Sequence, residues 1–330
     1  MISIICPIYN EEKYIVQCVE SVLSQDIDKS KIELLFVDGM STDSTRELLA
    51  PYLSQYPFIK CLDNPDRIVP KAMNIGIQSA TGNIIIRIDA HAKYEKNYIS
   101  TLVHYINTTG ADNVGAVCKT DVLNNTPISL AIKEVLGHPF GVGNSQFRIG
   151  VDRIMEVDTV PFGCWRRDVF ERFGMYDERL VRNQDIELNK RILRGGGKIL
   201  LVPDTFCTYF ARETIKPLMK NNYQNGFWNI KTVFLTKEFN SLSIRHFIPL
   251  FFVLSLIVPL LLSFFCFYSL TIGLFSLFLY TIVAVYFSTQ IKKYNSKVSI
   301  LNLYRVFVLL HISYGLGSLV SLLKLPLTKR

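Results

Sequence analysis

The sequence lacks several signatures that define other classes of protein. Its seven cysteines form no C-x-x-C pair and show no metal-ligand spacing, which is typical of reduced thiols in a cytoplasmic compartment. No G-x-G-x-x-G follows the first predicted strand, which argues against a Rossmann dehydrogenase. The first residues, Met1–Pro7, contain neither a basic segment nor a long apolar core. We therefore expect a strand there rather than a signal peptide, and a cytoplasmic location for the part that follows.

Charge is missing from one long segment, since no charged residue occurs from Phe247 to Thr289. A membrane-spanning helix needs about 20 apolar residues, so this segment is long enough for two helices with a break at Tyr268–Gly273. A third apolar run, Val306–Leu323, is interrupted only by His311. These runs predict transmembrane helices at about 247–267, 272–289 and 306–323. They form a membrane domain, 236–330, after a globular domain, 1–235.

Positive charges flank the first two apolar runs, and they predict how the chain is oriented. Their distribution places the globular domain and the 290–297 loop in the cytoplasm and makes the chain a multi-pass plasma-membrane protein. The third run would then put Lys324 and Lys329–Arg330 outside, so an interfacial or re-entrant third helix stays open. The flanking basic residues are Lys231, Lys237, Arg245, Lys292, Lys293 and Lys297.

The net charge of +8 raises the question of a nucleic-acid partner. The chain contains no basic tract and no nucleic-acid-binding motif. Its lysines and arginines near the apolar runs suit an anionic lipid surface better. We therefore expect a membrane as a partner and no nucleic acid.

Strand and helix patterns alternate through the globular domain and predict an α/β fold. The sheet is expected to be mostly parallel and Rossmann-like, with helices on both faces. Residues 124–155 are rich in Gly and Asn and are expected to be irregular. Strands are predicted at Ile2–Cys6 (stopped by Pro7), Ile32–Val37, Ile59–Leu62, Ile84–His91, Val114–Val117 and Lys198–Val202. Helices are predicted at Tyr14–Ser24, Ser44–Leu53, Val69–Ser79, Tyr98–Ile106, Asp168–Phe173 and 183–193.

Acidic residues occur where several of these elements end or begin. Asp38 ends the second strand, and Asp185 lies in the first turn of a helix. Asp89 and His91 are two residues apart, so in an extended backbone their side chains leave the same face and can hold a divalent cation. The alternative for each aspartate is a turn-capping or helix-capping role.

Four motifs, in order, resemble the inverting family 2 glycosyltransferases of GT-A fold. They are Ile5–Glu11, Val37–Asp43, Asp89-Ala90-His91 as the counterpart of D-x-D, and Gln184-Asp185 as the counterpart of E-D. The resemblance covers roughly residues 1–235. Within the family, Asn64-Pro65-x-Arg67, Arg87–Ala92 and residues 209–228 resemble the succinoglycan-biosynthesis (ExoA-like) subgroup. That subgroup builds bacterial exopolysaccharide repeat units on a lipid carrier.

The resemblance implies a UDP-sugar donor, a divalent metal (Mn²⁺ or Mg²⁺) and a lipid-linked, polyprenyl diphosphate glycan acceptor. The transferred sugar would be a glucose-type hexose. Asp89 would meet the ribose or the metal, and His91 would complete the metal site. The family usually has Asp where His91 stands, which leaves the identity of the metal open. The nucleotide-sugar site would comprise Pro7, Tyr9, Glu11, Asp38, Arg67, Lys71 and Asp89.

The acceptor side of the predicted site is centred on Asp185, which resembles the catalytic base of the family. Trp165 would offer a ring to stack on a sugar face, and a plain core position is its alternative. The other residues assigned to the acceptor or to a closing segment are Gly163, Gln184, Arg212 and Trp228.

Two other functions remain as alternatives. A processive β-glycan synthase, such as a hyaluronan-like enzyme, would carry Q-x-x-R-W, and the nearest segment here is Asn225–Trp228. Three apolar runs are also too few for an obvious polysaccharide channel, so a single transfer is favoured. The second alternative is a non-catalytic membrane scaffold. Such a protein would not need Asp38, Asp89 and Asp185, so their presence argues against it.

Overall fold

The computed structural model describes residues 1–239 and 242–324. The chain forms two compact units. The first contains Met1–Lys119 and Ile149–Tyr209, and the second contains Thr120–Arg148 and Phe210–Arg330. Lys329 and Arg330, whose side of the membrane entered the prediction above, lie outside the described residues.

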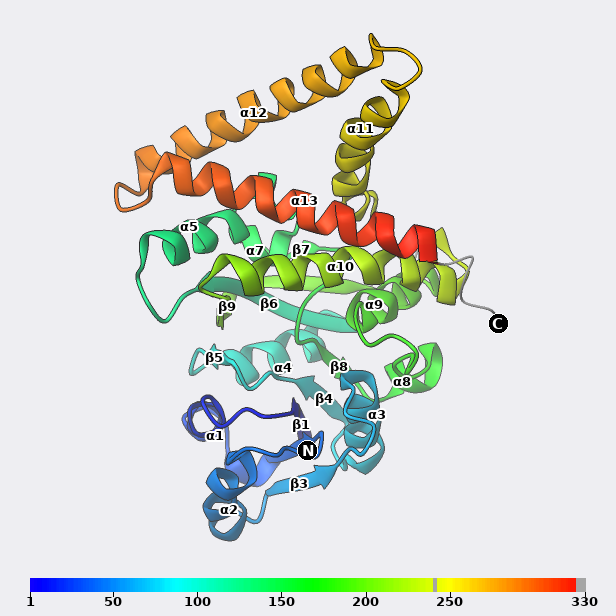
Figure 1. Ribbon diagram of the computed structural model, residues 1–330. Coiled ribbons are helices and arrows are strands. Elements are labelled where there is room, and N and C mark those ends of the chain that lie inside the picture. The colour runs from blue at the N-terminus through cyan, green and yellow to red at the C-terminus, as the bar shows by residue number, and fades with distance from the viewer. Residues whose placement is uncertain (240–241, 325–330) are drawn as a thin grey trace. The chain divides into compact units, whose positions relative to one another are not determined.

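The first half of a nine-stranded sheet is parallel. Its strands are β1 (Ile2–Ile8), β2 (Ile32–Asp38), β3 (Ile59–Asp63) and β4 (Ile84–Arg87), in the spatial order β3-β2-β1-β4. Every residue of β2 is buried, as the apolar run Leu34–Val37 at its centre requires. These strands lie in the blue and cyan part of the chain (Figure 1).

The second half of the sheet is mostly antiparallel. Beyond β4 follow β8 (Cys164–Arg166), β6 (Asn113–Asp121), β9 (Ile199–Phe210) and β5 (Ala92–Tyr94), and β7 (Met155–Glu156) pairs with β9. β4 and β8 are antiparallel, as are β6 and β8 and also β5 and β9. The α/β fold is confirmed, and its sheet is a mixed one.

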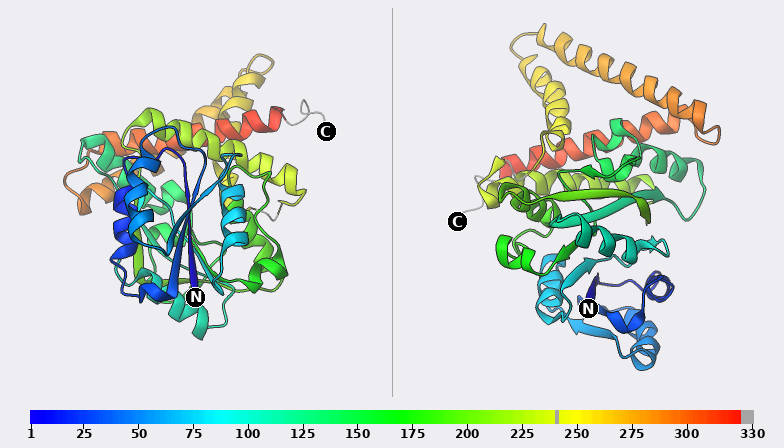
Figure 2. Two further views of the ribbon diagram at one scale, coloured as in Figure 1. Left: turned by 90° about the horizontal axis from the view of Figure 1, so that it is seen from below. Right: turned by 180° about the vertical axis from the view of Figure 1, so that it is seen from behind.

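Helices cover both faces of the parallel strands (Figure 2). Their apolar faces are buried, as with Ile15, Cys18, Val19 and Val22 in α1. The helices of this unit are α1 (Ile15–Leu23), α2 (Thr45–Gln55), α3 (Val69–Ser79), α4 (Tyr98–Thr108), α8 (Asp168–Phe173) and α9 (Gln184–Arg194). A short 3-10 helix occupies Lys29–Lys31.

The expectation that Pro7 stops the first strand was wrong, because β1 continues to Ile8. The pairing of β1 with β4 ends at Ile5, whereas its pairing with β2 continues to Ile8. The Ile5 carbonyl accepts from Ile88 on the β4 side. Pro7, two residues on, faces the same side, where β4 has already ended. Its missing N–H therefore costs no ladder hydrogen bond.

The expected irregular segment 124–155 was also wrong in part, because it contains helices α5 (Pro127–Leu136), α6 (Pro139–Val142) and α7 (Gln146–Ile149). Thr126 and Ser129 form a reciprocal capping box at the start of α5, and Pro127 occupies the first turn. These start signals are local, and the surrounding glycines and asparagines masked them.

The second unit also contains the C-terminal helices. They are α10 (Ile215–Thr236), a 3-10 helix at Ile244–His246, α11 (Ile248–Leu262), α12 (Ser269–Tyr294) and α13 (Ile300–Lys324). Three segments, Ile244–Leu262, Ser269–Tyr294 and Ile300–Lys324, are long and apolar enough to cross a membrane. The predicted domain boundary at 235 falls inside α10 and stays a prediction.

Candidate active site

Acidic residues gather at the carboxyl edge of the parallel strands. Asp38 ends β2 and Asp63 ends β3, while Glu11 follows β1 and Asp89 follows β4. Parallel strands end at one edge of a sheet, and ligands of open α/β sheets bind at this edge. The sequence-predicted positions Asp38, Asp89 and Glu11 therefore share one side of the molecule.

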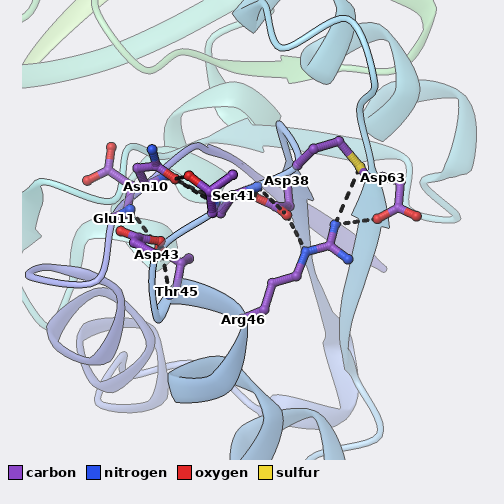
Figure 3. Close-up of polar contacts among 10 residues, drawn as sticks. Asn10, Glu11, Asp38, Ser41, Asp43, Thr45, Arg46 and Asp63 are labelled. Carbon is purple, nitrogen blue, oxygen red and sulfur yellow. Dashed lines mark hydrogen bonds and ion pairs between the residues drawn. The ribbon is translucent and has the colours of Figure 1, made fainter.

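The loops after β1 and β2 are joined by hydrogen bonds (Figure 3). The Asn10 backbone N–H donates to Ser41 Oγ at 2.9 Å, and the Thr42 N–H donates to Asn10 Oδ1 at 2.8 Å. The Glu11 N–H donates to Thr45 Oγ1 at 2.7 Å. Asn10 adopts a left-handed conformation with φ 56°. The predicted base and ribose loop, Pro7–Glu11, is thus held against the β2–α2 loop.

Asp38 is fully buried and its carboxylate accepts hydrogen bonds from Ser41 and Arg46. Ser41 Oγ donates to it at 2.5 Å, and the Ser41 N–H donates at 3.1 Å. Arg46 of α2 binds Asp38 through Nε and Asp63 through Nη2, so one guanidinium bridges the ends of β2 and β3 (Figure 3). The sequence prediction missed Arg46. A fully buried aspartate needs a cationic partner, and that requirement was the available signal.

Asp89 and His91 are in direct contact, although the predicted strand to His91 was too long. β4 ends at Arg87, and residues 90–91 form a turn. His91 Nδ1 lies 2.7 Å from Asp89 Oδ1 and 3.5 Å from Glu11 Oε1. The His91 ring also packs edge-on to Tyr209 of β9, with 5.3 Å between ring centroids.

The neighbouring carboxylates control the protonation of His91. Burial by itself lowers the pKa of His91, but Asp89 and Glu11 outweigh burial and raise this pKa to about 11. Burial likewise raises the pKa of Asp89, and the positive charges of His91 and Arg87 outweigh it and lower that pKa. At neutral pH the pair is therefore an ionised carboxylate beside an imidazolium.

The side chains of Asp89 and His91 provide part of the ligand set that a divalent cation needs. One carboxylate and one imidazole are in contact, a combination of oxygen and nitrogen that suits Mn²⁺ better than Mg²⁺. In the described ranges, 1–239 and 242–324, no group of three or more His, Cys, Asp and Glu side chains is arranged to hold a metal. A metal here would displace the proton from His91 and take its remaining ligands from the substrate.

Asp185, the predicted base, lies in the first turn of α9 and is paired with Arg87 of β4. Asp185 keeps 28% of its side chain exposed, whereas Arg87 keeps 7%. The guanidinium of Arg87 also lies 5.7 Å from the centre of the Phe162 ring. The sequence prediction did not assign this role to Arg87. An arginine inside the apolar run Ile84–Ile88 was the signal, because a buried charge requires a partner.

Two basic residues were predicted for the nucleotide-sugar site, Lys71 and Arg67. Lys71 lies 3.0 Å from Glu178 and 3.3 Å from Asp66, so its ammonium is already paired. Arg67 is exposed and has φ 61°.

The predicted acceptor residues are largely buried. Trp165 is 2% exposed and packs against Phe170 and Tyr176. It therefore occupies the core position that was the alternative to stacking on a sugar. Gly163 leaves no room for a Cβ beside Asn113. Gln184 is 8% exposed, and its Oε1 has no hydrogen-bond partner in the part of the chain that the structure describes.

The two closing-segment residues belong to the second unit. Arg212 precedes α10, and Trp228 lies within α10, where its ring is 4.3 Å from Lys231 Nζ. Their predicted approach to the donor diphosphate stays a prediction.

A sheet with its acidic residues at the carboxyl edge, and a helix-start aspartate beside them, defines an α/β enzyme of the nucleotide-binding kind. The profile of one protein family, described as "Glycosyl transferase family 2", matches residues 3–174. The match covers more than half of the chain. The chain therefore belongs to glycosyl transferase family 2 and is a glycosyltransferase.

Two curated relatives match most of the chain. One is the dolichyl N-acetyl-alpha-D-glucosaminyl phosphate 3-beta-D-2,3-diacetamido-2,3-dideoxy-beta-D-glucuronosyltransferase of Methanococcus voltae. It is 29% identical over 269 residues, 80% of this chain and 83% of the relative. The other is the succinoglycan biosynthesis protein ExoA of Rhizobium meliloti, 29% identical over 225 residues, 68% of this chain and 67% of the relative.

A solved structure confirms the GT-A fold class. The mannosyltransferase PcManGT from Pyrobaculum calidifontis, in complex with GDP-Man and Mn²⁺, superposes with a TM-score of 0.59 at 15% identity. The match covers 97% of this chain and 86% of that one.

Proposed function

We propose that this glycosyltransferase is membrane-anchored and inverting. It transfers a glucose-type hexose from a UDP-sugar to a lipid-linked, polyprenyl diphosphate glycan at the cytoplasmic face of the plasma membrane. The reaction would serve exopolysaccharide or cell-surface glycan synthesis. One observation carries this proposal. Arg87 links the base candidate Asp185 to the strand that leads to Asp89, so the acceptor and donor groups share one charge network.

On the donor side, the chain's own residues bind and orient the nucleotide. The buried Asp38 would accept hydrogen bonds from the base, and the Pro7–Glu11 loop would cover the base and ribose. Asp89 and His91 would hold the divalent cation, which when bound neutralises the charge that develops on the diphosphate. The hydrogen bonds from Ser41 and Arg46 fix the position of the Asp38 carboxylate.

On the acceptor side, Asp185 would take the proton of the attacking hydroxyl. The new bond forms between that oxygen and the anomeric carbon, while the bond from this carbon to the diphosphate breaks on the opposite face. The configuration at the anomeric carbon is thereby inverted. The Arg87 guanidinium, paired with the Asp185 carboxylate, holds this carboxylate in place.

The lipid-linked acceptor is supported by the relatives and by the apolar helices. The name of the Methanococcus voltae relative specifies a dolichyl phosphate sugar as acceptor, and that of the Rhizobium meliloti relative specifies succinoglycan biosynthesis. Three helices of this chain are apolar enough to enter a membrane, where a polyprenyl acceptor is found.

The test is transfer by the purified full-length protein with a panel of UDP-hexoses and GDP-mannose, with and without Mn²⁺ or Mg²⁺, on a defined polyprenyl diphosphate acceptor. We expect one UDP-hexose to be turned over and one sugar to be added. Asp185→Asn should lower kcat at least about 100-fold, because it removes the base, and should leave UDP binding intact. Asp168→Asn is the matched control, since Asp168 also lies in the first turn of a helix beside arginines.

Three results would contradict the proposal. Products with many added sugars would indicate a processive synthase. Turnover of GDP-mannose alone would show that the donor is GDP-mannose rather than a UDP-hexose. UDP binding without any transfer, in wild type and Asp185→Asn alike, would indicate a scaffold.

A further inference from the structure

The last apolar helix, α13, is buried to a very different extent from the other two. In the most apolar 18-residue window of α13, 44% of the residues are buried within the molecule. The corresponding windows of the segment Ile244–Leu262, which includes α11, and of α12 are 17% and 6% buried. The side chains of α13 therefore contact protein where those of α12 are left for lipid.

The first half of α13 packs on α5. Leu303, Val306, Phe307 and Leu310 form one apolar cluster with Ala131, Ile132 and Val135 of α5. Another face of α5 is polar, and its Lys133 is paired with Asp121 at 2.8 Å. Its Glu134 accepts a hydrogen bond from Asn295, between α12 and α13, at 2.8 Å.

The second half of α13 packs on α10 at backbone distance. A Cβ at Gly226 of α10 would meet the Tyr314 carbonyl, and one at Gly317 of α13 would meet the Tyr223 carbonyl. Ser318 Oγ donates to the Gly226 carbonyl at 3.0 Å, and Asn229 Nδ2 lies 2.5 Å from the Tyr314 hydroxyl. The two helices are thus in contact at the middle of each.

These neighbours cannot lie in hydrocarbon. α10 contains Lys216, Lys220 and Lys231 and many amide side chains, and α5 contains Lys133 and Glu134. A charged side chain at the centre of a bilayer costs about 2.5 to 3.5 kcal/mol or more. If α13 crossed the bilayer, its contacts at 314–318 would place the middle of α10 near the bilayer centre.

The contacts at the two ends of the α11–α12 hairpin also indicate the course of α13. Pro249 and Val253, near the start of α11, lie against Gly315. Ile291, near the end of α12, belongs to the cluster that includes Leu303. Figure 1 shows α13 running from the end of α12 past the start of α11. The two ends of a hairpin lie at the same face of a membrane, so a helix that joins them follows that face.

We propose that α13 does not cross the membrane but lies with α10 at the lipid–water boundary, on the side of the catalytic unit. Only the α11–α12 hairpin then enters the hydrocarbon. Leu301, Leu322 and Leu323 are 73%, 45% and 65% exposed and would meet acyl chains. The exposed Lys216 and Lys220 of α10 would meet anionic headgroups. Lys324 ends on the catalytic side, which resolves the conflict with the positive-inside rule.

The test is the side of the membrane on which Lys324 lies. Lys324→Cys and, on the exposed surface of α2, Ser54→Cys are introduced separately, with the exposed Cys266 and the half-buried Cys61 changed to serine, so that the remaining native cysteines are all buried. A membrane-impermeant maleimide is applied to right-side-out and inside-out vesicles. We expect both cysteines to be labelled in the same vesicle orientation. Labelling of Lys324→Cys in the opposite orientation, or in neither, would overturn the proposal.

A second measurement tests the contact on which the proposal depends. Asn229→Cys and Tyr314→Cys together should form a disulfide in native membranes, because these side chains are in contact. Asn229→Cys with Leu301→Cys, an exposed position in the first turn of α13, is the matched control and should stay reduced. Failure of the first pair to cross-link would also overturn the proposal. Neither measurement depends on transferase activity, so the proposed function and this topology can fail separately.

Discussion

At the scale of single residues, two arginines hold the aspartates of the site in place. The sequence motifs indicated the aspartates but not these arginines. Arg46 joins Asp38 to Asp63, and Arg87 holds Asp185. Buried charges persist only where an opposite charge and hydrogen bonds compensate for lost hydration. Each catalytic or binding aspartate of the proposal thus depends on one cationic partner.

Arg46 gives the first prediction at this scale. Arg46→Met removes the guanidinium that orients Asp38, and a charge-assisted hydrogen bond contributes about 1.5 kcal/mol or more. We expect the KM for the nucleotide-sugar to rise about tenfold with kcat nearly unchanged, in steady-state kinetics. Arg46→Lys keeps the charge but not the contact with both carboxylates, so its KM should lie between that of wild type and that of Arg46→Met. A loss of kcat at unchanged KM would place Arg46 in the chemical step instead.

Glu33 gives a prediction about pH. Its carboxylate accepts from Ser3 Oγ at 2.6 Å and Thr81 Oγ1 at 2.8 Å, and it joins β2 to β1 and to the turn before β4. Burial raises the pKa of Glu33, but these hydrogen bonds outweigh burial and lower it below its ordinary value of 4.5. The ionised form is therefore favoured by folding. Its contribution to stability is complete above pH 4.5 and is lost as the pH falls through the lowered pKa.

Glu33→Gln should consequently reduce the free energy of unfolding at pH 7 by about 2 kcal/mol. The difference from wild type should shrink at acid pH, measured by thermal unfolding between pH 7 and pH 3. Glu47→Gln is the control and should change the free energy of unfolding by less than about 1 kcal/mol, because it removes only an exposed charge in the first turn of α2. A wild-type advantage that grows on acidification would contradict the assignment.

At the scale of elements, α5 shows how a short local signal specifies a helix between polar loops. Thr126 caps α5 and accepts from the Ser129 N–H at 3.1 Å, and the Ser129 hydroxyl receives the Thr126 N–H at 2.9 Å. The helix in turn supports α13 through Ala131, Ile132 and Val135. The cap therefore acts on α13 through packing.

Thr126→Ala should destabilise the start of α5 by about 1 kcal/mol. Amide hydrogen exchange over 127–136 should then be about fivefold faster, since 1.4 kcal/mol corresponds to a factor of ten. Asn125→Ala is the control, because Asn125 is exposed and precedes the cap. Equal exchange in the two variants would show that packing against α13 alone determines the stability of α5.

At the scale of the whole molecule, each of the two compact units is formed by two separate stretches of the chain. Thr120–Arg148, from the middle of the globular part, belongs with the C-terminal helices. The apolar face of α5 and Leu218 of α10 are buried by α13 residues such as Phe307. The two compact units are therefore interleaved along the chain.

A chain truncated to residues 1–235 should aggregate, because it lacks the α13 side chains that cover α5 and α10. Size-exclusion chromatography of the truncated chain, with full-length protein in detergent as the control, checks this expectation. A monodisperse truncated chain that unfolds at the same temperature as the full-length protein would support a domain boundary at 235.

The sequence alone determined the features that depend on local pattern. Apolar strands with polar ends, acidic motifs in the family order, and uncharged runs long enough for membrane helices all follow from residue type and spacing. These patterns predicted the α/β fold and the family. They also correctly predicted the exact limits of α3, Val69–Ser79, where helical periodicity, an early proline and a closing Gly82 coincide.

Only the tertiary structure decided which distant residues meet. Arg87 and Asp185 are 98 positions apart, and nothing in either local pattern specifies that pairing. The burial of Trp165, the bridge made by Arg46 and the course of α13 depend in the same way on neighbours far along the chain. Apolar length predicts that a helix can enter a membrane, but the charge and packing of the helices beside it determine whether it crosses.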